Sequence, residues 1–199
     1  MEIRSVGNSG LQVSRIGLGT MTWGRDTDEH EAAELLDAFL SAGGTLVDTA
    51  DVYADGESEK ILGRLLVDSD RRDAVVLATK AVSRPAHERR FDASRGHLLN
   101  SLNGSLRRLG VDHVDLWQLH AWDPHTPLEE TLSAVDAAVA SGKVRYVGIS
   151  NYSGWQTATA AAYQAAAPGR VVPVCTQVEY SLLQRGVERE VVPALAESW

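Results

Sequence analysis

The chain has 199 residues, of which 19 are basic and 27 are acidic, so its formal net charge is −8 at pH 7. This charge argues against a surface that follows nucleic-acid phosphates, and no apolar run reaches membrane-spanning length, so we expect neither a nucleic-acid partner nor a membrane. Cys175 is the single cysteine, which excludes an intrachain disulfide, and Glu2 and Arg4 stand where a signal peptide is apolar; we expect one cytoplasmic domain, residues 1–199.

The first elements are a hairpin and a β/α unit. Apolar and polar residues alternate around Gly7–Gly10, which predicts a β-hairpin that covers part of the main fold. A short strand is expected at Ile16–Gly19. A helix then begins near Asp28, because Asp28 and Glu31 have the spacing of a capping box.

The β-then-α pattern recurs five more times, at intervals of roughly thirty to forty residues, which is the length of a parallel crossover unit. Thr126–Glu129 has the spacing of a second capping box, with proline in the first helical turn. The predicted strands are 46–48, 75–79, 114–119, 144–149 and 171–176, and the predicted helices are 57–66, 92–109, from 126, from 153 and from about 187 to 199.

Regular alternation predicts a parallel sheet covered by helices, in the α/β class. No strand is followed by the Gly-x-Gly-x-x-Gly loop of a doubly wound dinucleotide-binding sheet. Polar residues close nearly every strand, which is typical of a (β/α)8 TIM barrel. Since such a barrel needs eight units and about 250 residues, we expect an incomplete barrel of about six units preceded by the hairpin.

The polar residues at the strand ends should converge on one face of the barrel. A metal site is not expected, because only one of these residues is a histidine and there is no cysteine among them. A Schiff-base lyase that uses Lys80 as nucleophile is the stronger alternative, although a carboxylate beside the lysine would keep it charged. The residues are Asp48, Lys80, His120, Ser150, Asn151 and Gln177, with Tyr53 in the loop after the second strand.

With these residues in place, the chain resembles the aldo-keto reductases over its whole length, in the branch of bacterial reductases related to potassium-channel β-subunits. No single motif is specific, but their order and spacing are. The motifs are Asp48-Thr49-Ala50-x-x-Tyr53, Gly56-x-Ser58-Glu59-x-x-Leu62-Gly63, Thr79-Lys80, Gln118-Leu119-His120, Gly148-Ile149-Ser150-Asn151 and Gln177-Val178-Glu179-Tyr180.

The resemblance implies a reductase that converts aldehydes or ketones to alcohols by hydride transfer from NADPH. Tyr53 donates the proton, and the Lys80 ammonium stabilises the phenolate that remains. Asp48 holds Lys80, and His120 donates a hydrogen bond to the substrate oxygen.

The resemblance also implies the binding residues. Ser150, Asn151 and Gln177 would hold the nicotinamide carboxamide, and Gly19, Thr20 and Met21, with Asp48, would contact the rest of the cofactor. Trp23, Tyr53, His120 and Trp122 would form the substrate pocket. Alternatives remain open: Asn151 is equally explained as a helix cap, and the aromatic residues as ordinary packing.

The chain departs from the family pattern at its end. The family places its nicotinamide-stacking aromatic residue and its phosphate-binding basic residues after strands seven and eight, which are absent from this sequence. We therefore expect this chain alone to be poorly stable and to bind NADPH weakly. A cofactor-binding regulatory subunit with little turnover is the alternative function, and the carbonyl substrate and homo-oligomerisation are left open.

Overall fold

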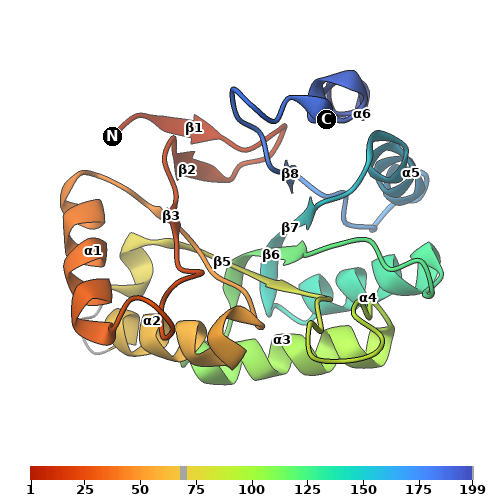
Figure 1. The fold of residues 1–199 in the computed structure, drawn as a ribbon. Coiled ribbons are helices and arrows are strands. Elements are labelled where there is room, and N and C mark those ends of the chain that lie inside the picture. Colours follow the sequence, from red (N-terminus) through yellow and green to blue (C-terminus); the bar gives the residue numbers. More distant parts are fainter. Residues whose placement is uncertain (68–70, 199) are drawn as a thin grey trace.

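The computed structural model describes residues 1–67 and 71–198. Six parallel strands form one curled sheet, and helices lie between successive strands on its outer side (Figure 1), which confirms the incomplete barrel. The strands are β3 (Leu18–Gly19), β4 (Leu46–Asp48), β5 (Val76–Ala81), β6 (Val114–Leu119), β7 (Val144–Ser150) and β8 (Cys175–Gln177), adjacent in that order. The helices are α1 (Glu29–Ser41), α2 (Glu57–Val67), α3 (Arg95–Leu109), α4 (Leu128–Ala140), α5 (Gly154–Ala165) and α6 (Val191–Ser198).

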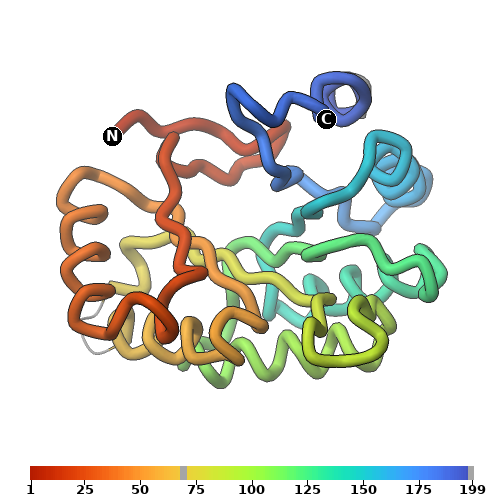
Figure 2. The backbone as a smooth tube through the Cα atoms, in the orientation of Figure 1, coloured from red at the N-terminus to blue at the C-terminus, as the bar shows by residue number. Residues whose placement is uncertain are grey.

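The sheet stays open, with β3 and β8 at its two edges. The backbone trace follows an arc through the six strands (Figure 2). Because strand number, stagger and diameter are linked in a closed barrel, six strands cannot close at the geometry of eight.

The core lies between the sheet and the helices. Alternate strand residues point outward to the helices, as Val47, Leu77 and Trp117 do, and each is at most 1% exposed. The intervening residues point inward, where the site is built.

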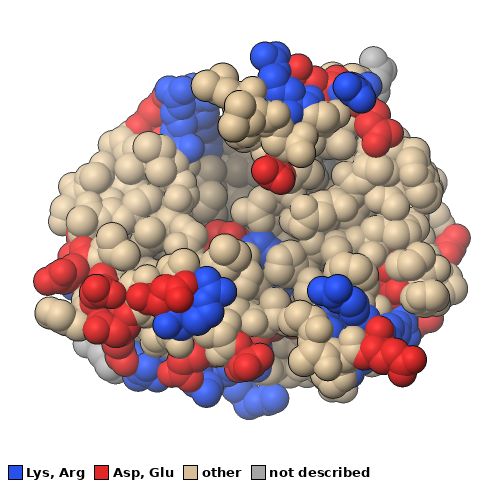
Figure 3. All heavy atoms as spheres, in the orientation of Figure 1, with Lys and Arg blue, Asp and Glu red and all other residues tan. Residues whose placement is uncertain are grey.

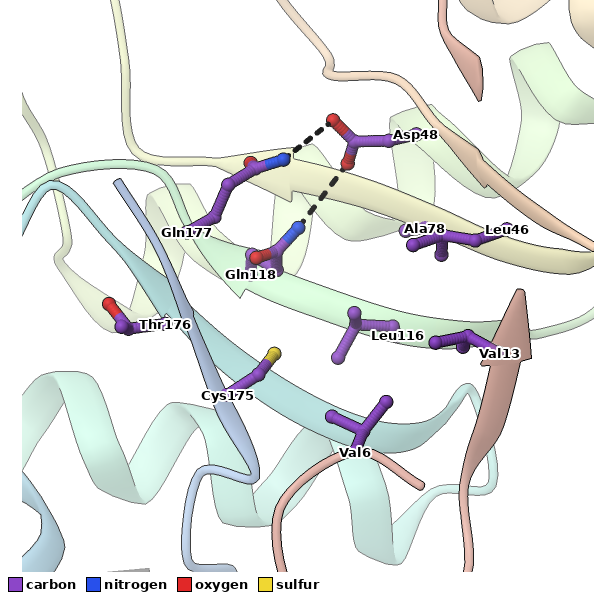
Figure 4. A pocket seen from close by; sticks show the side chains of 10 residues that line it. All are labelled: Val6, Val13, Leu46, Asp48, Ala78, Leu116, Gln118, Cys175, Thr176 and Gln177. Carbon is purple, nitrogen blue, oxygen red and sulfur yellow. Dashed lines mark hydrogen bonds between the residues drawn. The ribbon is translucent and has the colours of Figure 1, made fainter. Parts of the chain in front are cut away.

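The amino-terminal hairpin was correctly predicted: β1 (Ile3–Ser5) pairs antiparallel with β2 (Gln12–Ser14). It lies across the inner side of the sheet, where Val6 and Val13 point towards Leu116 (Figure 4). Together these residues form the apolar base of a cavity of about 180 Å³ whose mouth is polar. The hairpin therefore closes the inner side opposite the strand ends that carry the site.

Two predicted helix starts were confirmed by complete capping boxes: Asp28 with Glu31 at α1, and Ser153 with Gln156 at α5. The predicted box at Thr126 was wrong. The N-cap of α4 is Pro127, because the Thr126 hydroxyl accepts from Arg89 Nη2 at 2.7 Å and donates to Asp123 Oδ2 at 2.6 Å.

Three predicted boundaries moved by three residues or more, whereas smaller shifts place β3 from Leu18 and β5 at Val76–Ala81. Helix α3 begins at Arg95 and not at 92, because the Asp92 carboxylate is engaged by the backbone and hydroxyl of Ser94, the N-cap residue. Strand β8 begins at Cys175 and not at 171, because the Val171 N–H donates to Asp136 Oδ1 at 2.9 Å.

The third boundary is the last helix, where a short 3-10 turn, Gly186–Arg189, precedes α6. Its predicted end at Trp199 lies outside the described residues. Among the described residues, no helix is long and apolar enough to cross a membrane.

Candidate active site

The carboxyl ends of strands β4 to β8 open into a hollow on one face of the molecule. Figure 3 shows this face, with acidic and basic atoms together inside the hollow. The register pairs Lys80 of β5 with Gln118 of β6, Gln118 with Gly148 of β7, and Gly148 with Cys175 of β8, so these four residues form one inward row. Parallel pairing therefore brings the polar ends of the strands together, as the sequence predicted.

Lys80 is the centre of the site. It is 1% exposed, and its Nζ donates to Asp48 Oδ2 at 2.6 Å, to the Thr49 carbonyl oxygen at 2.9 Å and to Tyr53 Oη at 3.2 Å. The ammonium also lies 5.0 Å from the centroid of the Tyr53 ring. One buried cation is thus shared between a carboxylate and a phenol.

Asp48 accepts more hydrogen bonds than the sequence suggested. Besides Lys80, Gln118 Nε2 donates to its Oδ1 at 3.3 Å, and Gln177 Nε2 donates to its Oδ2 at 3.2 Å (Figure 4). Gln118 can lean towards Asp48 because Gly148 leaves room: a Cβ there would lie 2.7 Å from Cys175 Sγ and 3.1 Å from Gln118 Cγ. These donors fix the orientation of the carboxylate that holds Lys80.

Tyr53 lies in a loop that is tied to strand β5. The Thr49 N–H donates to the Ala78 carbonyl at 2.9 Å, and the Asp51 N–H donates to the Lys80 carbonyl at 3.1 Å. After Tyr53 the chain turns sharply, with Ala54 (φ 47°, ψ 44°) and Asp55 (φ 53°, ψ 36°) both left-handed. Such a conformation costs about 1–3 kcal/mol for each residue other than glycine, so the surroundings must hold this turn.

His120 completes the set. Its ring meets the Tyr53 ring edge-on, with 6.0 Å between centroids and an interplanar angle of 81°. Burial, and then the charge of Lys80, lower the pKa of His120 from 6.5 to about 4. His120 is therefore neutral at pH 7 and carries one ring N–H, and its buried Nδ1 has no hydrogen-bond partner among the described residues.

The three residues assigned to the nicotinamide carboxamide lie together at the ends of β7 and β8. Ser150 Oγ donates to the Gln177 carbonyl at 2.8 Å, and Asn151 Nδ2 donates to the His120 carbonyl at 3.0 Å. Asn151 is left-handed (φ 56°), a conformation that asparagine tolerates, and the cap of α5 is Ser153, so the helix-cap explanation of Asn151 is wrong.

This cluster suits an amide group. Gln177 is exposed at the mouth of the hollow, and its side-chain carbonyl and that of Asn151 make no hydrogen bond within the described residues, so both can accept N–H donors. These residues fit the carboxamide of a nicotinamide. Among the described residues, no group of three or more His, Cys, Asp or Glu side chains is placed to hold a metal ion.

The remaining predicted contacts differ in accessibility. Met21 is 56% exposed, whereas Thr20 is fully buried and its hydroxyl is engaged by Ser58 Oγ at 2.7 Å and the Asp48 carbonyl at 3.3 Å. Gly19 ends β3 opposite Asp48. Thr20 thus anchors the loop that precedes α1 to the site.

The two tryptophans assigned to the substrate pocket also differ. Trp23 is 1% exposed within the hydrophobic core and presents no surface to a substrate in this structure. Trp122 is partly buried beside the site and makes edge contacts with Tyr152 at 5.2 Å and Trp155 at 5.4 Å between centroids. Trp155, which sequence reasoning missed, is 59% exposed and extends this aromatic wall.

Buried charges near the site were also missed. The Asp123 side chain is fully buried and accepts from Arg89, from Thr126 and from the backbone of Ala93 and His125, at 2.6–2.9 Å. It joins the loop after β5 to the loop that carries Trp122. The sequence signal that could have identified Asp123 is its position three residues after His120, which lies at the end of a strand.

Cys175 lines the cavity beneath the site. Burial, and then the charge of Asp48, raise the pKa of its thiol to about 12. It is therefore protonated at pH 7.

Comparison with known proteins gives the following relationships. The profile of the Aldo/keto reductase family matches residues 15–198. "Aldo-keto reductase YhdN" of Bacillus subtilis (strain 168) is 38% identical over a match of 199 residues. The match covers 97% of this chain and 58% of the relative. "Uncharacterized oxidoreductase YrpG" of the same strain is 42% identical over a match of 207 residues. The match covers 98% of this chain and 62% of the relative.

A plant protein is similarly close. The "Probable voltage-gated potassium channel subunit beta" of Oryza sativa subsp. japonica is 38% identical over 196 residues, which cover 97% of this chain and 60% of the relative. The chain thus spans about 60% of the length of the curated relatives that it matches.

Proposed function

This chain belongs to the aldo/keto reductase family, and from this premise we propose that it is part of an NADPH-dependent oxidoreductase that reduces aldehydes or ketones to alcohols. Membership of this family supports a nicotinamide cofactor but does not distinguish NADPH from NADH. The choice of NADPH over NADH, and of a carbonyl substrate, is part of the proposal. Tyr53 is the proposed proton donor.

The observation that carries the proposal is the contact of one buried ammonium with both Asp48 and Tyr53. When bound, the reduced nicotinamide supplies a hydride to the carbonyl carbon. The carbonyl oxygen then becomes basic and takes the Tyr53 hydroxyl proton, and the Lys80 ammonium 3.2 Å away stabilises the phenolate. Asp48, held by two glutamine amides, keeps Lys80 in place.

His120 has a separate proposed role. Because its pKa is about 4, it is a neutral donor at pH 7. A neutral N–H can donate a hydrogen bond that polarises the carbonyl while the ring keeps its proton. Ser150, Asn151 and Gln177 are the proposed carboxamide-binding residues, and Trp122 is a proposed wall of the substrate pocket.

The alternative is a regulatory subunit that binds the cofactor but turns over slowly. The rice relative supports it, since that protein is named a probable potassium-channel subunit. A lyase with Lys80 as nucleophile is less well supported, because Lys80 is paired with a carboxylate at 2.6 Å.

The test uses a completed barrel, in which this chain is joined to the remaining residues of the Bacillus subtilis relative YrpG. We expect Tyr53→Phe to lower the turnover number for aldehyde reduction by at least about 100-fold while the dissociation constant for NADPH is unchanged. Tyr180→Phe is the matched control, because Tyr180 is 59% exposed. A Tyr53→Phe protein that reduces aldehydes at the original rate would show that Tyr53 is not the proton donor.

A further inference from the structure

A single buried ion pair lies behind the site, between helices α2 and α3. Arg108 Nη2 and Nε lie 2.6 and 2.7 Å from Glu59 Oε2, and the Glu59 side chain is completely buried. The other carboxylate oxygen, Oε1, accepts from Thr79 Oγ1 at 2.6 Å. Thr79 directly precedes Lys80 in β5, so the pair is bonded to the strand that presents the ammonium.

The same pair supports the turn that follows Tyr53. Gly56 is left-handed (φ 86°), and a Cβ at this position would lie 2.8 Å from Arg108 Cδ and 2.9 Å from Arg108 Nε. The guanidinium therefore packs directly against the Gly56 backbone. The left-handed residues Ala54 and Asp55 lie between this contact and Tyr53.

The segment before Tyr53 approaches the pair as well. The Asp51 carboxyl is buried close enough to Glu59 and Arg108 for both charges to act on it. Arg108 thus faces two carboxyl groups, those of Glu59 and Asp51. The chain on both sides of Tyr53, and the strand of Lys80, meet at this guanidinium.

We propose that Arg108 is a positioning residue: through its contact with Gly56 and its ion pair with Glu59, it holds Tyr53 Oη within hydrogen-bonding distance of Lys80 Nζ. The proposal rests on the proposed function, in which this contact supports proton transfer. Removal of the guanidinium leaves the left-handed turn without support and leaves two carboxyl groups without their shared cation. Tyr53 then leaves the Lys80 ammonium.

The competing explanation is that the pair merely joins α2 to α3. Arg108→Met tests this against Arg107→Met, which removes the same charge from an exposed neighbouring position on the same helix. In the completed barrel we expect Arg108→Met to lower kcat by about 10- to 100-fold, with KM and the NADPH dissociation constant within about two-fold of wild type. Arg107→Met should leave all three unchanged.

A second measurement needs no activity. In the completed barrel, labelling with 3-fluorotyrosine gives five 19F signals from the five tyrosines of this chain, besides those of the added residues, and Tyr53→Phe identifies the one from Tyr53. We expect Arg108→Met to shift and broaden the Tyr53 signal alone and to leave that of Tyr163 in α5 unchanged. An unchanged Tyr53 signal, or an equal change in all five signals, would overturn the positioning role.

If Arg108→Met does not fold, the double variant Glu59→Met/Arg108→Met replaces the pair by apolar side chains, an exchange that buried ion pairs often tolerate. The same loss of kcat and the same change in the Tyr53 signal are expected, and wild-type values would overturn the proposal. A wild-type barrel without reductase activity would contradict the proposed function only, because the 19F comparison still tests the position of Tyr53.

Discussion

Asp51 makes the stability of the chain depend on pH in a direction unusual for a carboxylic acid. Its Oδ1 is buried without a hydrogen-bond partner, and burial, followed by the charge of Glu59, raises its pKa from 3.8 to about 7. The folded chain therefore keeps a proton that the unfolded chain releases above pH 4. Its contribution to stability is complete below the unfolded pKa of 3.8 and is lost as the pH rises through 7.

The magnitude follows from the two pKa values. A pKa raised from 3.8 to about 7 corresponds to about 4 kcal/mol of unfolding free energy, of which about 2 kcal/mol is lost between pH 5 and pH 7. Asp51→Asn has similar size and no charge at any pH. We therefore expect the variant to be more stable than wild type at pH 8, with the difference nearly gone at pH 4.

Urea unfolding of the completed barrel, followed by circular dichroism at a series of pH values, measures this difference, and the titration of other groups cancels between the two proteins. Asp73→Asn is the control, since Asp73 is exposed on the 3-10 turn before β5. A difference between wild type and Asp51→Asn that stays constant from pH 5 to pH 8 would refute the argument that Asp51 is protonated in the folded state.

Three further predictions concern the fold. Asp123→Ala should lower the unfolding free energy by about 3–5 kcal/mol in urea titrations, because it leaves Arg89 and two backbone donors without their buried acceptor; an effect below about 1 kcal/mol would contradict this. Gly63→Ala should lower the melting temperature, because its Cβ would lie 2.6 Å from the Leu109 carbonyl oxygen and force α2 from α3; an unchanged melting temperature would show that the helices separate freely. Residues 1–199 alone should bind NADPH weakly and associate or aggregate through the open edges β3 and β8, and a monodisperse monomer with micromolar affinity, by size-exclusion chromatography and fluorescence titration, would contradict this.

The fold and the convergence of the site residues could be predicted because they depend on local patterns. Six repeats of the β-then-α pattern place strands in parallel, and parallel strands bring Asp48, Lys80, His120 and Gln177 to one edge. Helix starts were predictable where the capping residues had no other partner, as at Asp28. At Thr126 the hydroxyl instead accepts from Arg89, 37 positions earlier in the chain, and local spacing does not reveal this partner.

The supporting contacts could not be predicted because they join residues far apart in the chain. Arg108 reaches Glu59 across 49 positions, and the docking of α3 on α2 that brings them together depends on packing and not on a motif. Glu59 belonged to a recognised motif, but nothing in the sequence identified its partner. Likewise, the burial of Trp23 follows from the path of the loop after β3, which the sequence pattern does not determine.

Transfer of deuterium from NADPH labelled at the reactive nicotinamide carbon tests the central claim most directly. With the completed barrel and an aromatic aldehyde, we expect the alcohol product to carry one deuterium at the former carbonyl carbon, and we expect Tyr53→Phe to abolish this product while Tyr180→Phe retains it. Mass spectrometry of the alcohol gives the result. Tight binding of NADPH with no labelled alcohol from the wild-type barrel would contradict the account and would favour a cofactor-binding regulatory subunit.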